Sequence, residues 1–136
     1  MNRWLFYVKL YALTVPVFFV IDMLWLGVVA KGFYRSRLSE LLRPRPNWTA
    51  AFIFYFMYIV GILLFAVVPN LAVGSLRRCA LWGGLFGLFT YATYDLTNLA
   101  TLKGWPLSVT VVDILWGTVL CSAVASCSYG IGRWLG

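Results

Sequence analysis

Three aspartates stand inside stretches that are otherwise apolar, and their type and spacing could support chemistry. Asp22 lies within Val20–Trp25, Asp95 follows directly on Tyr94, and Asp113 lies within Val112–Gly117. A carboxyl group can carry a proton, hold a cation, or act as a general acid or base. Inside a membrane it costs about 2.5–3.5 kcal/mol on insertion scales, so it is normally partnered or faces water. We therefore expect the polar chemistry of this chain to lie at these three positions.

The composition indicates an integral membrane protein. Of 136 residues, 62% are hydrophobic and only 11% are charged, which is too few charges for an ordinary soluble surface. The net charge of +7 comes from Lys and Arg residues at the ends of apolar runs, where they would meet lipid headgroups, so we expect no nucleic-acid partner. The chain has no histidine, which excludes His-based metal sites and Ser-His triads. No metal or cofactor is expected.

The apolar runs predict an all-α fold, a four-transmembrane-helix bundle in a single domain over 1–136. Each run is close to the 20 or so residues that a membrane span requires. A short amphipathic interfacial helix is expected between spans one and two, because Phe33, Tyr34 and Leu38 share one helical face. Gly104 and Pro106 predict a tight hairpin between spans three and four. The four spans are expected at about 10–30, 49–68, 79–102 and 106–128.

The three aspartates are predicted to lie at one depth. Asp22 is 8 residues before Ala30, Asp95 is 7 before Leu102, and Asp113 is 7 after Pro106. At 1.5 Å per residue, all three lie roughly 10–12 Å below the same membrane surface. Three carboxyl groups close together cannot all be charged at low cost, so we expect at least one to carry its proton.

Helical neighbours of the aspartates complete a predicted polar pocket. Tyr91, Asp95 and Asn98 share one face of span three, and Thr110 and Asp113 share one face of span four. The alternative is that the acids only make hydrogen bonds between helices. The predicted pocket is lined by Asp22, Asp95, Asp113, Tyr55, Tyr91, Asn98, Trp25, Trp116 and Thr110.

Basic residues in the first and third loops predict contacts with lipid headgroups. These residues are Lys31, Arg35, Arg37 and Lys103. Positive charge is almost balanced between the two sides, and the dense cluster in the first loop favours that side as cytoplasmic.

The runs Asp22–Gly27, Tyr94–Pro106 and Val112–Gly117, together with Phe33-Tyr34-Arg35 and the segment from Phe54 to Gly61, resemble the domain-of-unknown-function family 2177. Its members are small bacterial inner-membrane proteins, and the likeness covers nearly the whole chain. The resemblance implies a multi-pass protein of the bacterial inner membrane, and it implies no activity.

Three functions fit the residues. The first is a pocket that binds or conducts a small cation, a proton or a polar solute, for which a homodimer would be needed because four spans are few for a transporter. The second is an enzyme that uses Asp acid–base chemistry on a lipid or isoprenoid. The third is a structural or accessory subunit. The carboxylates favour the first function.

Overall fold

The computed structural model describes residues 1–136, which form helices and no strands. The helices are α1 (Arg3–Leu24), continued by the π-helical turn η1 (Trp25–Val29), then α2 (Phe33–Arg37), α3 (Trp48–Ile62), continued by the π-helical turn η2 (Leu63–Val67) and by α4 (Val68–Val73), then α5 (Leu76–Thr101) and α6 (Leu107–Leu135). The all-α prediction is confirmed.

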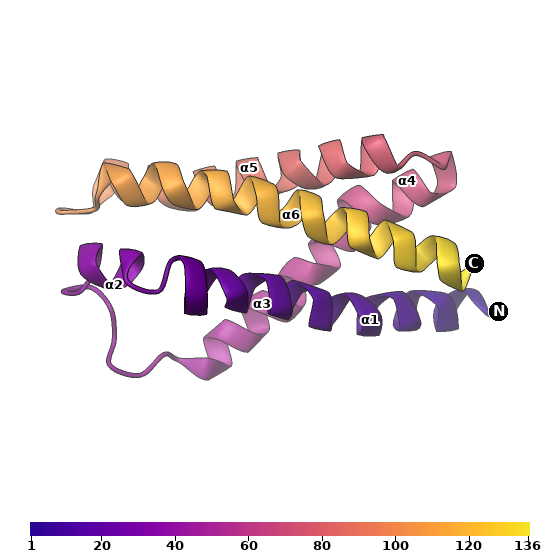
Figure 1. Ribbon diagram of the computed structural model, residues 1–136, viewed down its shortest axis with the longest axis horizontal. Coiled ribbons are helices and arrows are strands. Elements are labelled where there is room, and N and C mark those ends of the chain that lie inside the picture. Colours follow the sequence, from indigo (N-terminus) through magenta and orange to yellow (C-terminus); the bar gives the residue numbers. More distant parts are fainter.

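The long helices lie side by side, and α3 crosses the others obliquely (Figure 1). α5 and α6 form the predicted antiparallel hairpin, with Gly104 in the left-handed conformation (φ 74°) in the turn that joins them. α1 packs on α6 and α3, whereas α5 meets the second helical stretch at η2 and α4. Both termini lie at one end of the bundle, and the loop carrying α2 lies at the other (Figure 1).

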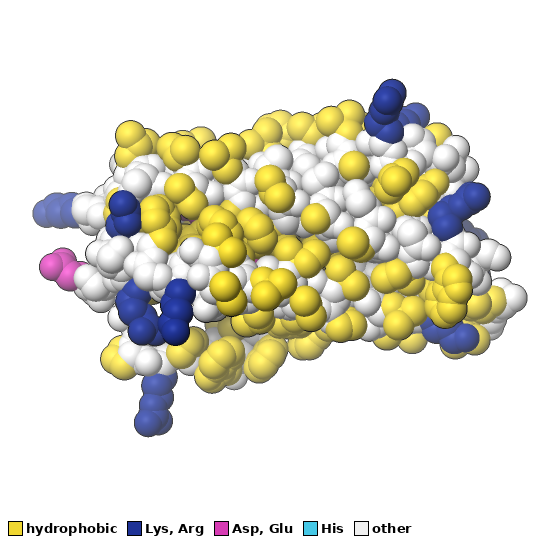
Figure 2. All heavy atoms as spheres, viewed as in Figure 1, with side chains coloured by type: hydrophobic (Ala, Val, Ile, Leu, Met, Phe, Trp, Pro, Cys, Tyr) yellow, Lys and Arg dark blue, Asp and Glu magenta, His cyan; other side chains and the backbone are white.

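The surface has the character of a membrane protein. Lys and Arg side chains gather at the two ends, and apolar side chains lie between them (Figure 2). Three helical stretches are long and apolar enough to cross a membrane: Arg3–Val29, Trp48–Val73 and Leu107–Leu135. α5 is not among them, so the predicted count of four spans is not confirmed. Its C-terminal half carries the Tyr, Thr and Asp residues that lower its hydropathy.

Two helices extend beyond the spans that were predicted, and the loop helix is short. The second helical stretch was expected to stop at Pro69, but it continues through α4 to Val73. η2 ends two residues before Pro69, and the Val68 N–H donates to the Leu63 carbonyl. Pro69 then lies in the first turn of α4, where its missing N–H costs no regular helical hydrogen bond. The last helix runs to Leu135 instead of ending near residue 128. In the first loop only Phe33–Arg37 is helical, and an interfacial position for α2 stays a prediction.

Small residues allow α5 and α6 to pack closely. A Cβ atom on Gly83 would lie 2.6 Å from the Ala125 Cβ, and one on Gly87 would lie 2.1 Å from the Gly117 carbonyl oxygen. Gly117 in turn makes room for the ring of Tyr91. This contact holds Tyr91 against α6 and so brings the C-terminal half of α5 to the first turns of α6.

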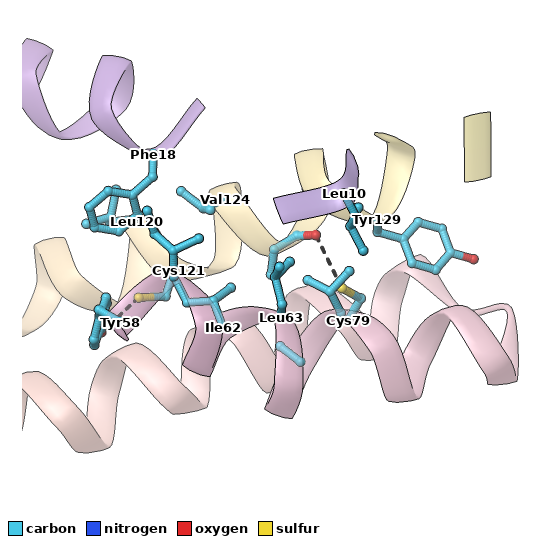
Figure 3. Packing of buried hydrophobic residues seen from close by; sticks show 14 residues of the cluster. Leu10, Phe18, Tyr58, Ile62, Leu63, Cys79, Leu120, Cys121, Val124 and Tyr129 are labelled. Atoms are coloured by element: carbon cyan, nitrogen blue, oxygen red, sulfur yellow. Dashed lines mark hydrogen bonds between the residues drawn. The ribbon is translucent and has the colours of Figure 1, made fainter. Parts of the chain in front are cut away.

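The apolar core lies between α1, α3–η2, α5 and α6 (Figure 3). Phe18, Ile62 and Leu120 are fully buried in it. Two cysteine thiols take part in its few polar contacts: Cys79 donates to the Ala125 carbonyl at 3.3 Å, and Cys121 lies 3.1 Å from the Tyr58 hydroxyl. This core fixes the helices whose loop-side halves carry the aspartates.

Candidate functional site

Asp22 is a fully partnered carboxyl group. It is 5% exposed on α1, and its two oxygens accept hydrogen bonds from the Tyr55 hydroxyl of α3 (3.2 Å) and the Trp116 indole N–H of α6 (3.3 Å). One carboxyl therefore connects three helices. This is the arrangement expected of an acid that holds a bundle together.

Trp25 and Trp116 stack beside Asp22. Their ring centroids are 4.4 Å apart and their planes differ by 7°. The Trp25 indole N–H donates to the Tyr34 hydroxyl (3.1 Å), and that hydroxyl donates to a carboxyl oxygen of Asp113 (2.9 Å). A hydrogen-bonded chain thus runs from η1 through α2 to α6.

Tyr34 is a stable donor in this chain. Burial raises the pKa of its phenol, and the neighbouring Asp113 carboxylate raises that pKa further. The hydroxyl therefore keeps its proton well above neutral pH, and Asp113 always receives this hydrogen bond while the fold is intact.

Asp95 has no donor for either carboxyl oxygen. It is completely buried (0% exposed), and no N–H or O–H group of the protein donates to it. Its carboxyl is a near neighbour of the Asp113 carboxyl. Two carboxylates have no hydrogen to share, so this contact is favourable only when a proton lies between them. Asp95 and Asp113 therefore form a carboxyl pair, whose contact would be favourable if the two groups shared one proton.

A cavity of about 390 Å³ opens beside this carboxyl pair. Asp113 forms part of its wall, and the remaining lining residues are Phe54, Tyr58, Thr90, Tyr91 and Tyr94. The Tyr58 hydroxyl lies 2.7 Å from that of Thr90, which joins α3 to α5 at this cavity. Asp113 is the carboxyl that a ligand in the cavity would meet, and Asp95 lies beside it in the interior.

The other residues predicted for the pocket are divided between two places. Tyr91 lines the cavity, whereas Tyr55, Trp25 and Trp116 belong to the Asp22 and Tyr34 contacts just described. Two residues lie apart from the carboxyls: Asn98 contacts the Tyr94 hydroxyl, and Thr110 accepts from the Trp105 indole at 3.2 Å.

The basic residues predicted to contact headgroups lie at the loop end. Lys31, Arg35, Arg37 and Lys103 are all exposed. Arg37 also donates to the Ser108 hydroxyl (3.0 Å) and lies over the Phe33 ring at 4.4 Å. These contacts fasten α2 to the start of α6.

Sequence reasoning missed five residues of the site. Four of them line the cavity. For two of these four the sequence carried a signal: Tyr58 is one helical turn from Tyr55, and Tyr94 is adjacent to Asp95. Tyr34 carried no such signal, because nothing in the spacing shows that the first loop folds back over α6. The missed residues are Tyr34, Phe54, Tyr58, Thr90 and Tyr94.

A family model described as "Predicted membrane protein (DUF2177)" matches residues 7–130. The chain belongs to this family. The resemblance that the sequence motifs indicated is thereby confirmed, and the DUF2177 match contains all three aspartates. No curated protein and no solved structure matches the chain.

In this DUF2177 protein the carboxyl groups divide into a partnered one and an unpartnered pair. Asp22 already has two donors, so it needs no ligand. Asp95 and Asp113 have one donor between them, from Tyr34, and lie beside a cavity. No group of three or more His, Cys, Asp or Glu side chains is placed to hold a metal ion.

Proposed function

We propose that this protein binds a small cation at the Asp95–Asp113 pair and releases the proton that the pair shares. The observation that carries the proposal is the buried carboxyl of Asp95, which has no donor and lies against a second carboxyl that faces a cavity. A positive charge in the cavity favours the ionised form of Asp113 and of its partner. Bound cation and bound proton then compete for the same pair of carboxyl groups.

The proposal places the site within a four-span protein of the bacterial inner membrane, with α5 as the fourth crossing. α5 has 26 residues, which corresponds to about 39 Å of helix and exceeds the hydrocarbon thickness. It packs along α6, which does qualify as a span. Several of the polar residues that lower its hydropathy turn toward α6 or the cavity, among them Tyr91 and Asp95. A polar helix face inside a bundle is compatible with a membrane crossing.

The proposal can be tested by measuring proton release. The purified protein in detergent, in weakly buffered solution near pH 7, is mixed with sodium chloride or methylammonium chloride while a pH-indicator dye is monitored. We expect up to one proton per protein from the parent chain and none from Asp113→Asn. The matched control is Glu40→Gln, which neutralises the fourth acid of the chain, an exposed one outside the site.

Two results would contradict the proposal. One is proton release from Asp113→Asn equal to that of the parent. The other is that no cation releases a proton from the folded parent protein. The highest concentration tested is the one at which ionic strength alone begins to change the dye signal.

A further inference from the structure

We propose, on the basis of the function above, that the cation is an organic ammonium ion with an apolar body. The carboxyl pair alone could bind any cation, whereas the residues that line the cavity favour an organic cation over an inorganic one. Of the six lining residues, four are aromatic: Phe54, Tyr58, Tyr91 and Tyr94. The faces of aromatic rings attract cations, and aromatic cages around quaternary ammonium groups are the best-known use of this attraction.

The rings are held in place by one another. Phe54 and Tyr58 stack on α3 with centroids 5.2 Å apart, and Tyr91 of α5 stands nearly edge-on to Tyr58 at 6.2 Å and 70°. Tyr94 is fixed by an edge-on contact with Trp105 at 5.8 Å. A rigid aromatic wall of this kind needs little ordering when a ligand binds, which favours affinity.

The cavity has too few polar groups to replace the hydration shell of an inorganic ion. A bare sodium or magnesium ion requires about six oxygen ligands, and the cavity offers one carboxylate, one threonine and tyrosine hydroxyls of which that of Tyr58 is already hydrogen-bonded. Its volume of about 390 Å³ falls in the range of roughly 300–1,000 Å³ typical of sites for small organic molecules. An alkyl or aryl ammonium ion carries its charge without requiring such a shell.

The ligand reaches the cavity from the side, between α3 and α5. Because α3 crosses the bundle obliquely (Figure 1), the backbones of the two stretches approach closely at η2 and α4, whereas nearer the N-terminus of α3 the contact with α5 is made by side chains such as Tyr58 and Thr90. At the opening, Phe54 is 44% and Tyr94 is 57% exposed. In a bilayer this opening faces the acyl chains, so a ligand with an apolar body would concentrate there before it binds.

No basic side chain competes with the ligand for Asp113. The titratable groups that face this carboxyl from each surrounding element are Asp22 on α1, Tyr34 on α2, Tyr58 on α3, and Tyr91, Tyr94 and Asp95 on α5. All are acids or phenols, so the positive charge must come from a proton or from a ligand. When a quaternary ammonium ion binds, the shared proton leaves to water and no covalent bond to the ligand is made.

The test uses benzyltrimethylammonium, its uncharged carbon isostere neopentylbenzene, and the two cations of the preceding experiment. Binding to the protein in lipid nanodiscs is followed by proton release and by tryptophan fluorescence. We expect benzyltrimethylammonium to release the proton at a concentration at least tenfold lower than methylammonium or sodium. Neopentylbenzene is expected to release none.

Aromatic variants locate the site. Tyr94→Leu keeps an apolar side chain and removes one ring face, so it should weaken benzyltrimethylammonium binding by roughly 2- to 30-fold. The matched control is Phe89→Leu, which removes a 67%-exposed ring of the same helix outside the cavity. It should leave affinity unchanged. Thermal melting of both variants checks that they are folded.

The outcomes separate this inference from the function on which it rests. If sodium or methylammonium releases the proton as readily as benzyltrimethylammonium, the inference about the ligand is wrong and the proposed function stands. The inference is also wrong if neopentylbenzene competes as well as its charged counterpart, or if Tyr94→Leu binds as the parent does. If none of the three cations releases a proton, the proposed function itself is wrong.

Discussion

The same substitution, Asp to Asn, should have different effects at Asp22 and at Asp95. Asp22 accepts hydrogen bonds from two donors, Tyr55 and Trp116, at 3.2 and 3.3 Å. An Asn side chain has one acceptor oxygen, which can stay at the Trp116 indole N–H. Its NH₂ group would then face the Tyr55 hydroxyl, whose O–H is left without an acceptor. Asp95 receives no hydrogen bond and adjoins another carboxyl. There an Asn has the shape of a protonated Asp and its NH₂ can donate to that carboxyl.

The expected magnitudes follow from these contacts. In Asp22→Asn one donor loses its acceptor in the interior, which costs about 1–3 kcal/mol. For a chain of this length, 1 kcal/mol corresponds to roughly 3–5 °C in melting temperature. Asp22→Asn should therefore melt roughly 3–15 °C below the parent chain. Asp95→Asn exchanges one neutral donor for another, and its free energy of unfolding should change by less than about 1 kcal/mol.

The assay is thermal unfolding in one detergent at one pH near 7, followed by tryptophan fluorescence, with proton release measured on the same samples. Asp95→Asn should keep the stability of the parent and lose proton release. The reasoning would be refuted if Asp95→Asn destabilised the protein as much as Asp22→Asn, because Asp95 would then be a partnered structural residue.

Three further predictions concern the contacts around the site. Gly87→Ala would place a Cβ atom 2.1 Å from a backbone oxygen of α6 and should lower the free energy of unfolding by about 1–3 kcal/mol. In the control Gly130→Ala nothing lies within 4 Å, so stability should be unchanged or rise by up to about 1 kcal/mol. Equal melting temperatures for the two variants would contradict the close approach of α5 and α6. Tyr55→Phe and Asp22→Asn should be non-additive by about 0.5–1.5 kcal/mol in a double-mutant cycle, because both remove the hydrogen bond that the Tyr55 hydroxyl donates to Asp22. Strict additivity would contradict that bond. Tyr34→Phe should lower the free energy of unfolding by about 0.5–1.5 kcal/mol at pH 7. Because the pKa of Tyr34 is raised in the folded protein, this difference in stability from the parent should persist up to about pH 10 and shrink above it. A difference that already falls between pH 7 and 9 would contradict a buried donor at this position.

The fold and part of the site could be predicted from the sequence because they depend on periodicity. The spacing of Asp22, Asp95 and Asp113 from their helix ends placed them toward one end of the bundle, and Gly104 and Pro106 predicted the hairpin of α5 with α6. Partner choice could not be predicted in the same way. Which donors reach Asp22 and which miss Asp95 depends on differences of an ångström or two in helix packing, and periodicity does not determine these.

The position of Tyr34 shows a second limit. Its hydroxyl reaches Asp113 across 79 residues of sequence, and it does so from a loop whose path depends on Arg37 and on the turn after η1. Hydropathy places such a loop at the membrane surface but does not fold it. The proposed fourth span has a related difficulty. Polar residues that face the interior, such as Asp95 on α5, lower the mean hydropathy of a helix as much as exposed ones do, so the helix is harder to recognise as a membrane segment.

The π-helical turn η2 also affects how this chain can change in length. A π-helical turn accommodates one residue more than an α-helical turn while the helix on either side keeps its direction and its buried face. A chain lacking one residue within Leu63–Val67 should therefore fold with Tyr55 and Tyr58 still directed at their partners. Loss of one residue within Trp48–Ile62 would instead rotate everything on its N-terminal side by about 100°. Natural length variation that preserves the carboxyl site is thus expected at residues 63–67 of this helix.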